Sequence, residues 1–220
     1  MTLSLAAAGV AAAQERVALP TQDSGKVHAN VYGDARSGRG IVLAHGGRFN
    51  KESWAKQVPA LVNAGYRVVA IDFRGYGQST GPGQKDLFTA PLYYDVLAAV
   101  KYLQTSGVKS VSLMGGSMGG SVSADAMAHL KAGEIERLVL LGSRGGDAPE
   151  KIKARTLYIM CRDDENADGK RLPGVRADYE KTPDPKEMVL LECSAHAQFI
   201  FDTEHADRLM REILRFLAAS

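Results

Sequence analysis

The segment Gly115–Gly120 carries the clearest chemical signal in the sequence, because it contains the pattern Gly-x-Ser-x-Gly around Ser117. Apolar residues typical of a strand precede this segment, and residues typical of a helix follow it. A serine on such a sharp turn projects its hydroxyl from the end of a sheet, and flanking glycines avoid side-chain collisions there. The spacing matches neither a dinucleotide-binding Gly-x-Gly-x-x-Gly loop nor a phosphate-binding loop, which needs a lysine after its last glycine. We therefore predict Ser117 as a nucleophile.

A serine hydroxyl is a weak nucleophile unless a histidine accepts its proton and a carboxylate orients that histidine. The sequence has five histidines. Four of them lie in predicted strands or helices or at their ends: His28, His45, His129 and His205. Of these, His45 is expected to shape the loop after its strand. His196 lies on a loop between the last predicted strand and the last predicted helix, and we predict it as the base.

The orienting carboxylate should follow a strand that lies between the serine and the histidine in chain order. Three adjacent acidic residues, Asp163, Asp164 and Glu165, follow the predicted strand 156–160. Asp147 follows the preceding strand and is in a less suitable place. The residues alone leave Asp163 and Asp164 as alternatives for the acid.

The elements around these residues alternate in a way that predicts βαβ units and a mainly parallel sheet. The predicted strands are short and apolar: 27–32, 40–45, 67–72, 110–114, 137–141, 156–160 and 187–192. The predicted helices are 53–64, 93–106, 118–131, 174–181 and 204–217. The strand 27–32 alternates in hydropathy and is expected at a sheet edge, whereas 40–45 is typical of a strand buried on both faces.

The composition is that of one globular domain. The 220 residues include 27 Lys and Arg against 25 Asp and Glu, a formal net charge of +2. Because no run of basic residues is present, nucleic acid is not an expected partner. No apolar run reaches the roughly 20 residues of a membrane span, and no metal-binding motif is present. No pattern indicates an oligomeric state.

The first 13 residues are uncharged and end in three alanines, which resembles the cleavage site of a secretory signal. A basic start is missing, so we interpret residues 1–13 as the remnant of a signal peptide, with a short apolar arm as the alternative. Residues 14–220 then form a single domain. We expect a secreted or periplasmic protein, and a cytoplasmic one if this segment is not a signal.

Five segments together resemble the α/β hydrolase superfamily, in the family's order and over nearly the whole chain from about Lys26. They are His45–Gly47, Asp72–Ser79, Gly115–Gly120, the acidic loop 161–165 and the histidine loop 193–199. The resemblance implies an α/β fold in which helices flank a mostly parallel central β-sheet. The connection between the strands 137–141 and 156–160 is too short for the cap domain that many relatives carry there.

The resemblance also implies roles for individual residues. The acid of this family is usually the fourth residue of a Gly-x-x-Asp-like turn, here 161–164, which favours Asp164 and keeps the preceding residue as the alternative. The oxyanion hole would use the backbone N–H groups of Met118 and Gly47. Arg48 is the alternative donor if that loop is set one residue later.

The reaction implied by the resemblance is hydrolysis of an ester through an acyl-enzyme on Ser117, assisted by His196 and Asp164, with no cofactor. The missing cap predicts a shallow, open site for a small-molecule ester, either short-chain or bulky and reached from solution. Four aromatic residues are candidates for lining it: Phe49, Trp54, Tyr76 and Phe199. A peptidase, thioesterase, acyltransferase or haloperoxidase would use the same machinery, and a non-catalytic binding protein is the alternative from another class.

The two cysteines occupy matching places in the resemblance. Cys161 precedes Asp164 by three residues, and Cys193 precedes His196 by three. If their strands are sheet neighbours, as the family order implies, a disulfide would tie the acid loop to the histidine loop, provided that the Cα atoms lie within about 7 Å. The alternative is two buried free thiols.

Overall fold

The computed structural model describes residues 15–219, and eight strands in it form one sheet in the order β1-β2-β4-β3-β5-β6-β7-β10. The strands are β1 (Glu15–Pro20), β2 (Lys26–Tyr32), β3 (Arg39–Ala44), β4 (Tyr66–Ile71), β5 (Ser110–Gly116), β6 (Arg137–Leu141), β7 (Arg155–Cys161) and β10 (Lys186–Leu191). The pairs β1–β2 and β2–β4 are antiparallel, and the other neighbouring pairs are parallel. The prediction of a mostly parallel α/β sheet is confirmed.

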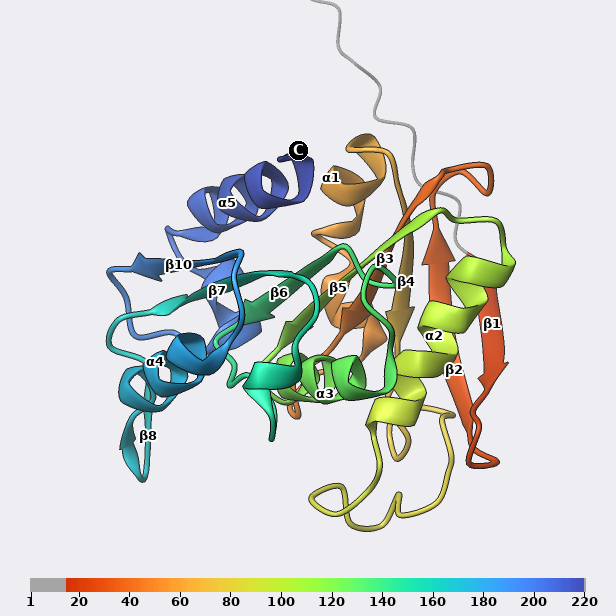
Figure 1. Cartoon of the computed structure of the whole chain (residues 1–220), viewed down its shortest axis with the longest axis horizontal. Coiled ribbons are helices and arrows are strands. Elements are labelled where there is room, and N and C mark those ends of the chain that lie inside the picture. The colour runs from red at the N-terminus through yellow and green to blue at the C-terminus, as the bar shows by residue number, and fades with distance from the viewer. Residues whose placement is uncertain (1–14, 220) are drawn as a thin grey trace, which may run out of the picture.

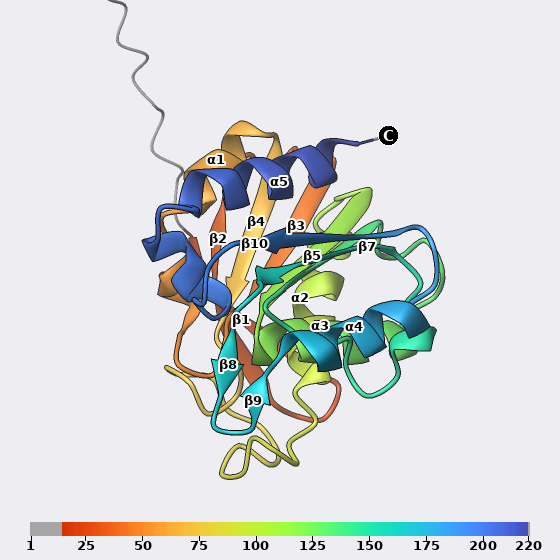
Figure 2. The ribbon, with the colours of Figure 1, turned by 90° about the vertical axis from the view of Figure 1, so that its left-hand side faces the viewer.

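Helices cover both faces of this sheet, as Figures 1 and 2 show. The helices are α1 (Val58–Asn63), α2 (Tyr93–Thr105), α3 (Met118–Ala126), α4 (Leu172–Lys181) and α5 (Ala206–Ala218). Helices α1 and α5 lie on one face, and α2, α3 and α4 lie on the other. On α5, Leu209, Ile213 and Phe216 are buried because their spacing places them on one side of the helix.

The central strands explain why the sheet needs both helical layers. Every residue of β4 and of β6 is buried, so each strand presents apolar side chains to both faces. Side chains that alternate along a strand point to opposite faces. Two separate apolar cores result, one beneath α2 and α3 and one beneath α1 and α5.

One prediction about the sheet edge is wrong. The strand predicted at 27–32 is not at the edge, because β1 pairs with it from Glu15 opposite Val31 to Pro20 opposite Lys26. Most side chains of β1 are exposed or half-buried, so its sequence carries only a weak apolar signal. The outer antiparallel strand therefore escaped the sequence analysis.

Two predicted helices are shorter in the structure. The stretch 53–64 divides into a 3-10 helix, η1 (Lys51–Trp54), and α1, whose first turn contains Pro59. Proline is favoured in a first turn because its missing N–H would have no helical acceptor there. The helix predicted at 118–131 ends as α3 at Ala126 and continues only as the 3-10 helix η2 (Met127–His129).

The connection between β6 and β7 contains only a 3-10 helix, η3 (Pro149–Lys151), within the described residues, so no cap is inserted there. A small hairpin that the sequence did not indicate, β8 (Glu165–Asn166) with β9 (Gly169–Lys170), follows β7. None of the helices between residues 15 and 219 has the length and apolar character of a membrane span.

Candidate active site

Ser117 lies on the sharp turn between β5 and α3. Its backbone has φ 50° and ψ −120°, a region that residues other than glycine rarely adopt. A Cβ on Gly115 would lie 2.4 Å from the Gly119 backbone, and one on Gly119 would lie 2.3 Å from the carbonyl oxygen of Ala44. Both flanking glycines are therefore required by close approach of the backbone, as the motif predicts.

The structure brings Ser117, His196 and Asp164 together in one hydrogen-bonded chain. Ser117 Oγ lies 2.8 Å from His196 Nε2, and His196 Nδ1 lies 2.6 Å from Asp164 Oδ2. A carboxylate only accepts hydrogen bonds, so the imidazole carries its proton on Nδ1. Nε2 then accepts the hydrogen bond of the serine hydroxyl, which is the arrangement that proton removal from Ser117 requires.

The two candidate aspartates have different partners. Asp164 is fully buried and faces His196. Asp163 is exposed and accepts a hydrogen bond of 2.5 Å from Lys170 Nζ, which holds the pKa of the Asp163 carboxyl below its usual value. The structure thus places Asp164, and not Asp163, against the imidazole.

Three hydrogen bonds hold the loop after β3 next to Ser117. The Gly46 carbonyl accepts from His45 Nδ1 at 2.9 Å and from the Phe49 N–H at 2.9 Å, and the Gly46 N–H donates to Gln198 Oε1 at 2.7 Å. In a trans peptide the N–H of the next residue points opposite to the carbonyl. Fixing the Gly46 carbonyl therefore also fixes the direction of the Gly47 N–H.

His45 shapes this loop, as its place in the sequence indicates. Its ring is fully buried, and burial lowers its pKa below the usual value. Nε2 accepts a hydrogen bond of 3.2 Å from the Phe73 N–H, which leaves the proton of the neutral ring on Nδ1 for the Gly46 carbonyl. The neutral tautomer is thus the one that holds the loop.

Gln198 is a residue of the site that the sequence analysis missed. Its side chain is buried, accepts from the Gly46 N–H and donates to Ser53 Oγ at 2.7 Å. It therefore connects the histidine loop to the loop of Gly47. Its position two residues after His196 was the only local signal, and that signal does not reveal a partner 152 residues away.

The two backbone N–H groups predicted for an oxyanion hole are unpaired in the described part of the chain. The N–H groups of Gly47 and Met118 have no acceptor among residues 15–219. Both residues line the same space as Ser117. The Gly47 carbonyl accepts a hydrogen bond of 2.7 Å from Tyr76 Oη, which steadies the loop from its other side.

A cleft of about 450 Å³ opens beside Ser117. We call it the aromatic cleft, and its walls include Phe49, Tyr76, Leu87, Phe88 and Phe199. The rings of Phe49 and Phe199 lie 4.8 Å apart, and Phe88 is fully exposed at the cleft. Of the four predicted lining aromatics, Trp54 is the wrong one, because η1 turns it into the core, where it is fully buried.

A second cavity, of about 280 Å³, also has Ser117 in its wall. We call it the polar cavity, and its walls include Ser121, Ser143, Arg144, Lys170 and Arg171. The buried Ser143 hydroxyl donates to the Ser117 carbonyl at 2.8 Å. Ser117, Met118 and Arg171 line both spaces.

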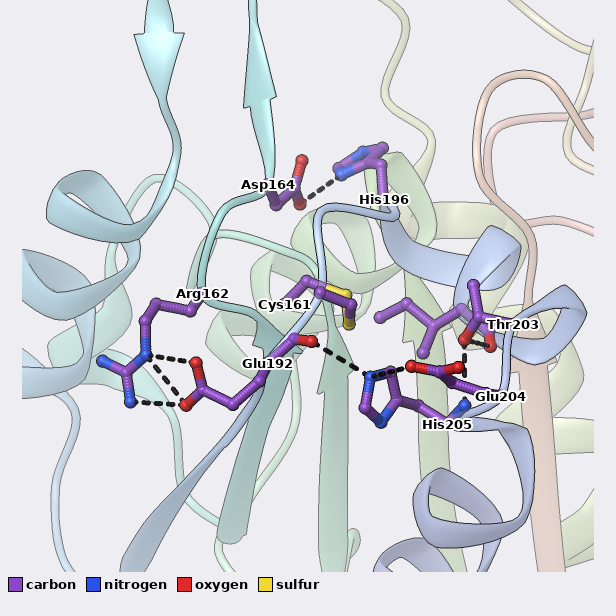
Figure 3. The surroundings of a disulfide bond; sticks show 10 residues. Cys161, Arg162, Asp164, Glu192, His196, Thr203, Glu204 and His205 are labelled. Carbon is purple, nitrogen blue, oxygen red and sulfur yellow. Dashed lines mark hydrogen bonds and ion pairs between the residues drawn. A yellow bond between two sulfur atoms is a disulfide. The ribbon is translucent and has the colours of Figure 1, made fainter.

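The structure contains the disulfide between Cys161 and Cys193, with a Cα–Cα distance of 4.9 Å (Figure 3). The parallel pairing of β7 and β10 brings the two cysteines together, since Leu191 lies opposite Cys161. Figure 3 shows the bridge close to the Asp164–His196 pair. The pairing is confirmed, and the alternative of two free thiols is excluded.

We expect a Cys161→Ala/Cys193→Ala variant to lose about 2–4 kcal/mol of unfolding free energy, because the bridge closes a loop of 32 residues. Urea unfolding followed by circular dichroism measures this loss. As a control, dithiothreitol should destabilise the parent protein and leave the variant unchanged. Equal urea midpoints for the parent and the variant would contradict the prediction.

The described residues contain no group of three or more His, Cys, Asp or Glu side chains that could hold a metal ion. The hydrogen-bonded chain of Ser117, His196 and Asp164 has the arrangement that activates a hydroxyl as a nucleophile.

Known proteins resemble this chain in sequence and in structure. A non-heme haloperoxidase of Rhodococcus erythropolis is 36% identical over 115 residues, which is 51% of this chain and 39% of that protein. Protein phosphatase methylesterase 1 of Mus musculus is 31% identical over 141 residues, 64% of this chain and 36% of that protein. The chain therefore spans less than half of the length of these curated relatives.

Two solved esterases share the fold at low sequence identity. The esterase Pf2001 of Pyrococcus furiosus superposes with a TM-score of 0.78 at 20% identity, covering 94% of this chain and 92% of that one. Esterase RhEst1 from Rhodococcus sp. ECU1013 superposes with a TM-score of 0.74 at 18% identity, covering 93% and 98%. The sequence model of the alpha/beta hydrolase fold matches residues 41–172, more than half of the chain. The chain belongs to the alpha/beta hydrolase family.

Proposed function

We propose that this protein is a serine carboxylesterase that hydrolyses small or short-acyl esters. The observation that carries the proposal is the hydrogen-bonded chain from Ser117 Oγ through His196 to the buried Asp164. A hydroxyl in this setting can lose its proton to the imidazole while it attacks a carbonyl carbon. The family assignment and the esterases among the structural neighbours support the same reaction class.

In the proposed mechanism, Ser117 Oγ forms a bond to the ester carbonyl carbon, and its proton passes to His196 Nε2. The tetrahedral oxyanion accepts hydrogen bonds from the Gly47 and Met118 N–H groups, and each such donor contributes about 3–4 kcal/mol of transition-state stabilisation. The imidazolium then gives its proton to the leaving alcohol, and an acyl-enzyme remains. Water, deprotonated by the same imidazole, releases the acid and restores the serine. Asp164 holds the ring and stabilises its charged form.

The lack of a cap supports small or short-acyl substrates. η3 is the only helical or strand element between β6 and β7 in the described residues, and the aromatic cleft is open enough to leave Phe88 fully exposed. A long acyl chain would gain little burial there. We expect no jump in rate at the micelle threshold of a long-chain ester, because the described residues offer no large lid that could open.

Labelling with a fluorophosphonate tests the proposal directly. The expected reaction is displacement of fluoride by Ser117 Oγ, which adds one phosphonyl group to the peptide that contains this serine. The folded protein should react and the urea-denatured protein should not, because activation requires His196 at 2.8 Å. A screen of 4-nitrophenyl esters from acetate to palmitate then measures the preferred acyl length. No labelling at a saturating probe concentration would refute the proposal.

We further propose that the protein works outside the reducing cytosol. The Cys161–Cys193 disulfide supports this, because such bridges persist in oxidising compartments. The interpretation of residues 1–13 as a signal remnant concerns a segment that lies outside the described residues. Mass spectrometry of the protein recovered from culture supernatant, periplasm and cytosol would locate it and define its first residue.

A further inference from the structure

The two spaces beside Ser117 differ in chemistry. The aromatic cleft presents mostly rings and a leucine, together with Arg48 and Arg171, whereas the polar cavity presents hydroxyls and three cationic side chains. A substrate whose ester carbonyl reaches Ser117 has one end near each space. The cations of the polar cavity therefore influence which substrates bind, provided that their donors are available to a ligand.

Two of the three cations donate side-chain hydrogen bonds to carboxylates of the protein. Arg144 donates to both carboxylate oxygens of Asp178, one of them at 2.8 Å from Nη2. Lys170 Nζ lies 2.5 Å from Asp163 Oδ1. Each of these pairs therefore commits part of a cationic head group to a carboxylate of the protein.

Arg171 is different, because its guanidinium donates no hydrogen bond to the described residues. Its Nε lies 3.3 Å from Asp164 Oδ1 but makes no hydrogen bond to it. No oxygen between residues 15 and 219 accepts a hydrogen bond from Nη1 or Nη2 of Arg171. The side chain keeps 36% of its surface exposed, and it lines both spaces beside Ser117.

The backbone fixes Arg171 relative to the proposed machinery. Its N–H donates to the Asp164 carbonyl at 2.9 Å, and its own carbonyl accepts from the Val175 N–H at 3.1 Å as α4 begins. The Arg171 side chain therefore extends from a backbone that is held beside the acid loop. A planar guanidinium whose two outer nitrogens are open matches the two oxygens of a carboxylate.

Among residues 15–219, one other cation near the site has no acceptor for its side chain. Arg48 is exposed at the aromatic cleft and does not line the polar cavity. Its side chain extends from a loop whose neighbouring carbonyl, that of Gly47, is held by Tyr76. Arg48 thus serves as a comparison for Arg171, because a ligand anion could in principle pair with either residue.

We propose that Arg171 is a specificity-determining residue that selects esters carrying a carboxylate on one side of the scissile bond. This inference rests on the proposed ester hydrolysis. The carboxylate pairs with the Nη edge of Arg171 from the polar cavity, and the uncharged part of the substrate packs in the aromatic cleft. The preferred substrates are then monoesters of dicarboxylic acids or esters of hydroxy acids. In these two classes the same anion lies on the acyl side or on the alcohol side.

Matched pairs of esters test the proposal and distinguish the two sides. Mono-4-nitrophenyl adipate against 4-nitrophenyl methyl adipate places or removes a charge on the acyl side. 4-Acetoxybenzoate against methyl 4-acetoxybenzoate does the same on the alcohol side. In the parent protein we expect kcat/KM for the anionic member to exceed that for its neutral partner in at least one pair, after subtraction of the enzyme-free rate.

Substitutions then assign the effect to a residue. Arg171→Gln should lower the anionic-to-neutral ratio of kcat/KM by about tenfold or more, mainly through KM, because one charged hydrogen-bonding partner is lost. Arg171→Lys should restore part of the ratio. Lys170→Gln and Arg48→Gln, which remove a paired cation and an exposed one, should change the ratio less than threefold.

Several outcomes would overturn the inference. A residue that only neutralises Asp164 would affect both members of each pair alike, so an unchanged ratio in Arg171→Gln refutes selection by Arg171. A loss of ratio in Arg48→Gln instead would place the anion elsewhere. The neutral esters separate this inference from the proposed function: their hydrolysis tests the esterase, and the ratio tests Arg171. Calorimetric titration with adipate measures binding without turnover, and equal affinity in the parent and Arg171→Gln would also refute the inference.

Discussion

A Ser117→Ala variant is expected to lose at least about 10⁴-fold in kcat for 4-nitrophenyl acetate while it folds like the parent. The substitution removes the nucleophile, so no acyl-enzyme forms. The side chain of Ser117 has one hydrogen-bond partner among the described residues, His196, and its backbone bonds to Leu141 and Gly120 do not depend on the hydroxyl. The thermal midpoint should therefore stay within a few degrees of the parent value.

Ser123→Ala is the matched control for this prediction. Ser123 lies on α3, the helix that follows Ser117; it is buried and donates its hydroxyl to the Gly119 carbonyl at 2.7 Å. Removing it should cost about 1 kcal/mol of stability and leave kcat within threefold. The two variants thus separate loss of chemistry from loss of folding. Ester turnover by Ser117→Ala at the parent rate would show that another residue is the nucleophile.

Local sequence patterns predicted the parts of the site that local geometry requires. The turn around Ser117 needs glycines because Gly115 and Gly119 approach neighbouring backbone, and that need is visible in six residues of sequence. The sequence also predicted the parallel strands, because strands buried on both faces are continuous apolar runs. The histidine loop followed from its place between the last strand and the last helix.

Local sequence patterns could not predict the contacts between distant segments. Gln198 acts through Gly46, and Trp54 is buried because the chain divides into η1 and α1 before the helix can continue. The open donors of Arg171 become apparent only when the hydrogen bonds of the other cations of the polar cavity are known. Such features depend on which side chains the fold brings together, and no spacing in the sequence encodes them.

The residues alone could not decide between Asp163 and Asp164, because that choice also depends on contacts with distant segments. Consecutive residues in a turn point in different directions, so one residue of offset exchanges a buried carboxylate for an exposed one. The family pattern favoured Asp164, and the structure gives the physical difference: Asp164 faces His196, whereas Asp163 pairs with Lys170. This difference allows two nearly identical substitutions to have very different expected effects.

Asp164→Asn is expected to lower kcat for a neutral ester by about 10⁴-fold, whereas Asp163→Asn should change it less than threefold. An amide at position 164 presents an N–H₂ group that donates to His196 Nδ1, which moves the ring proton to Nε2. The ring then has no lone pair for the Ser117 hydroxyl, so the serine keeps its proton. At position 163 the amide faces solvent and loses only an exposed ion pair with Lys170, which contributes little.

Single-turnover kinetics with 4-nitrophenyl acetate measure this difference at the acylation step. In Asp164→Asn the burst of nitrophenol should slow by the same factor as kcat, because the tautomer affects acylation and deacylation alike. Thermal midpoints of the two variants control for folding, since Asp164 is fully buried and Asp163 is exposed. If Asp163→Asn were instead the slow variant, the carboxylate that faces His196 in the structure would not be the one that orients it during the reaction.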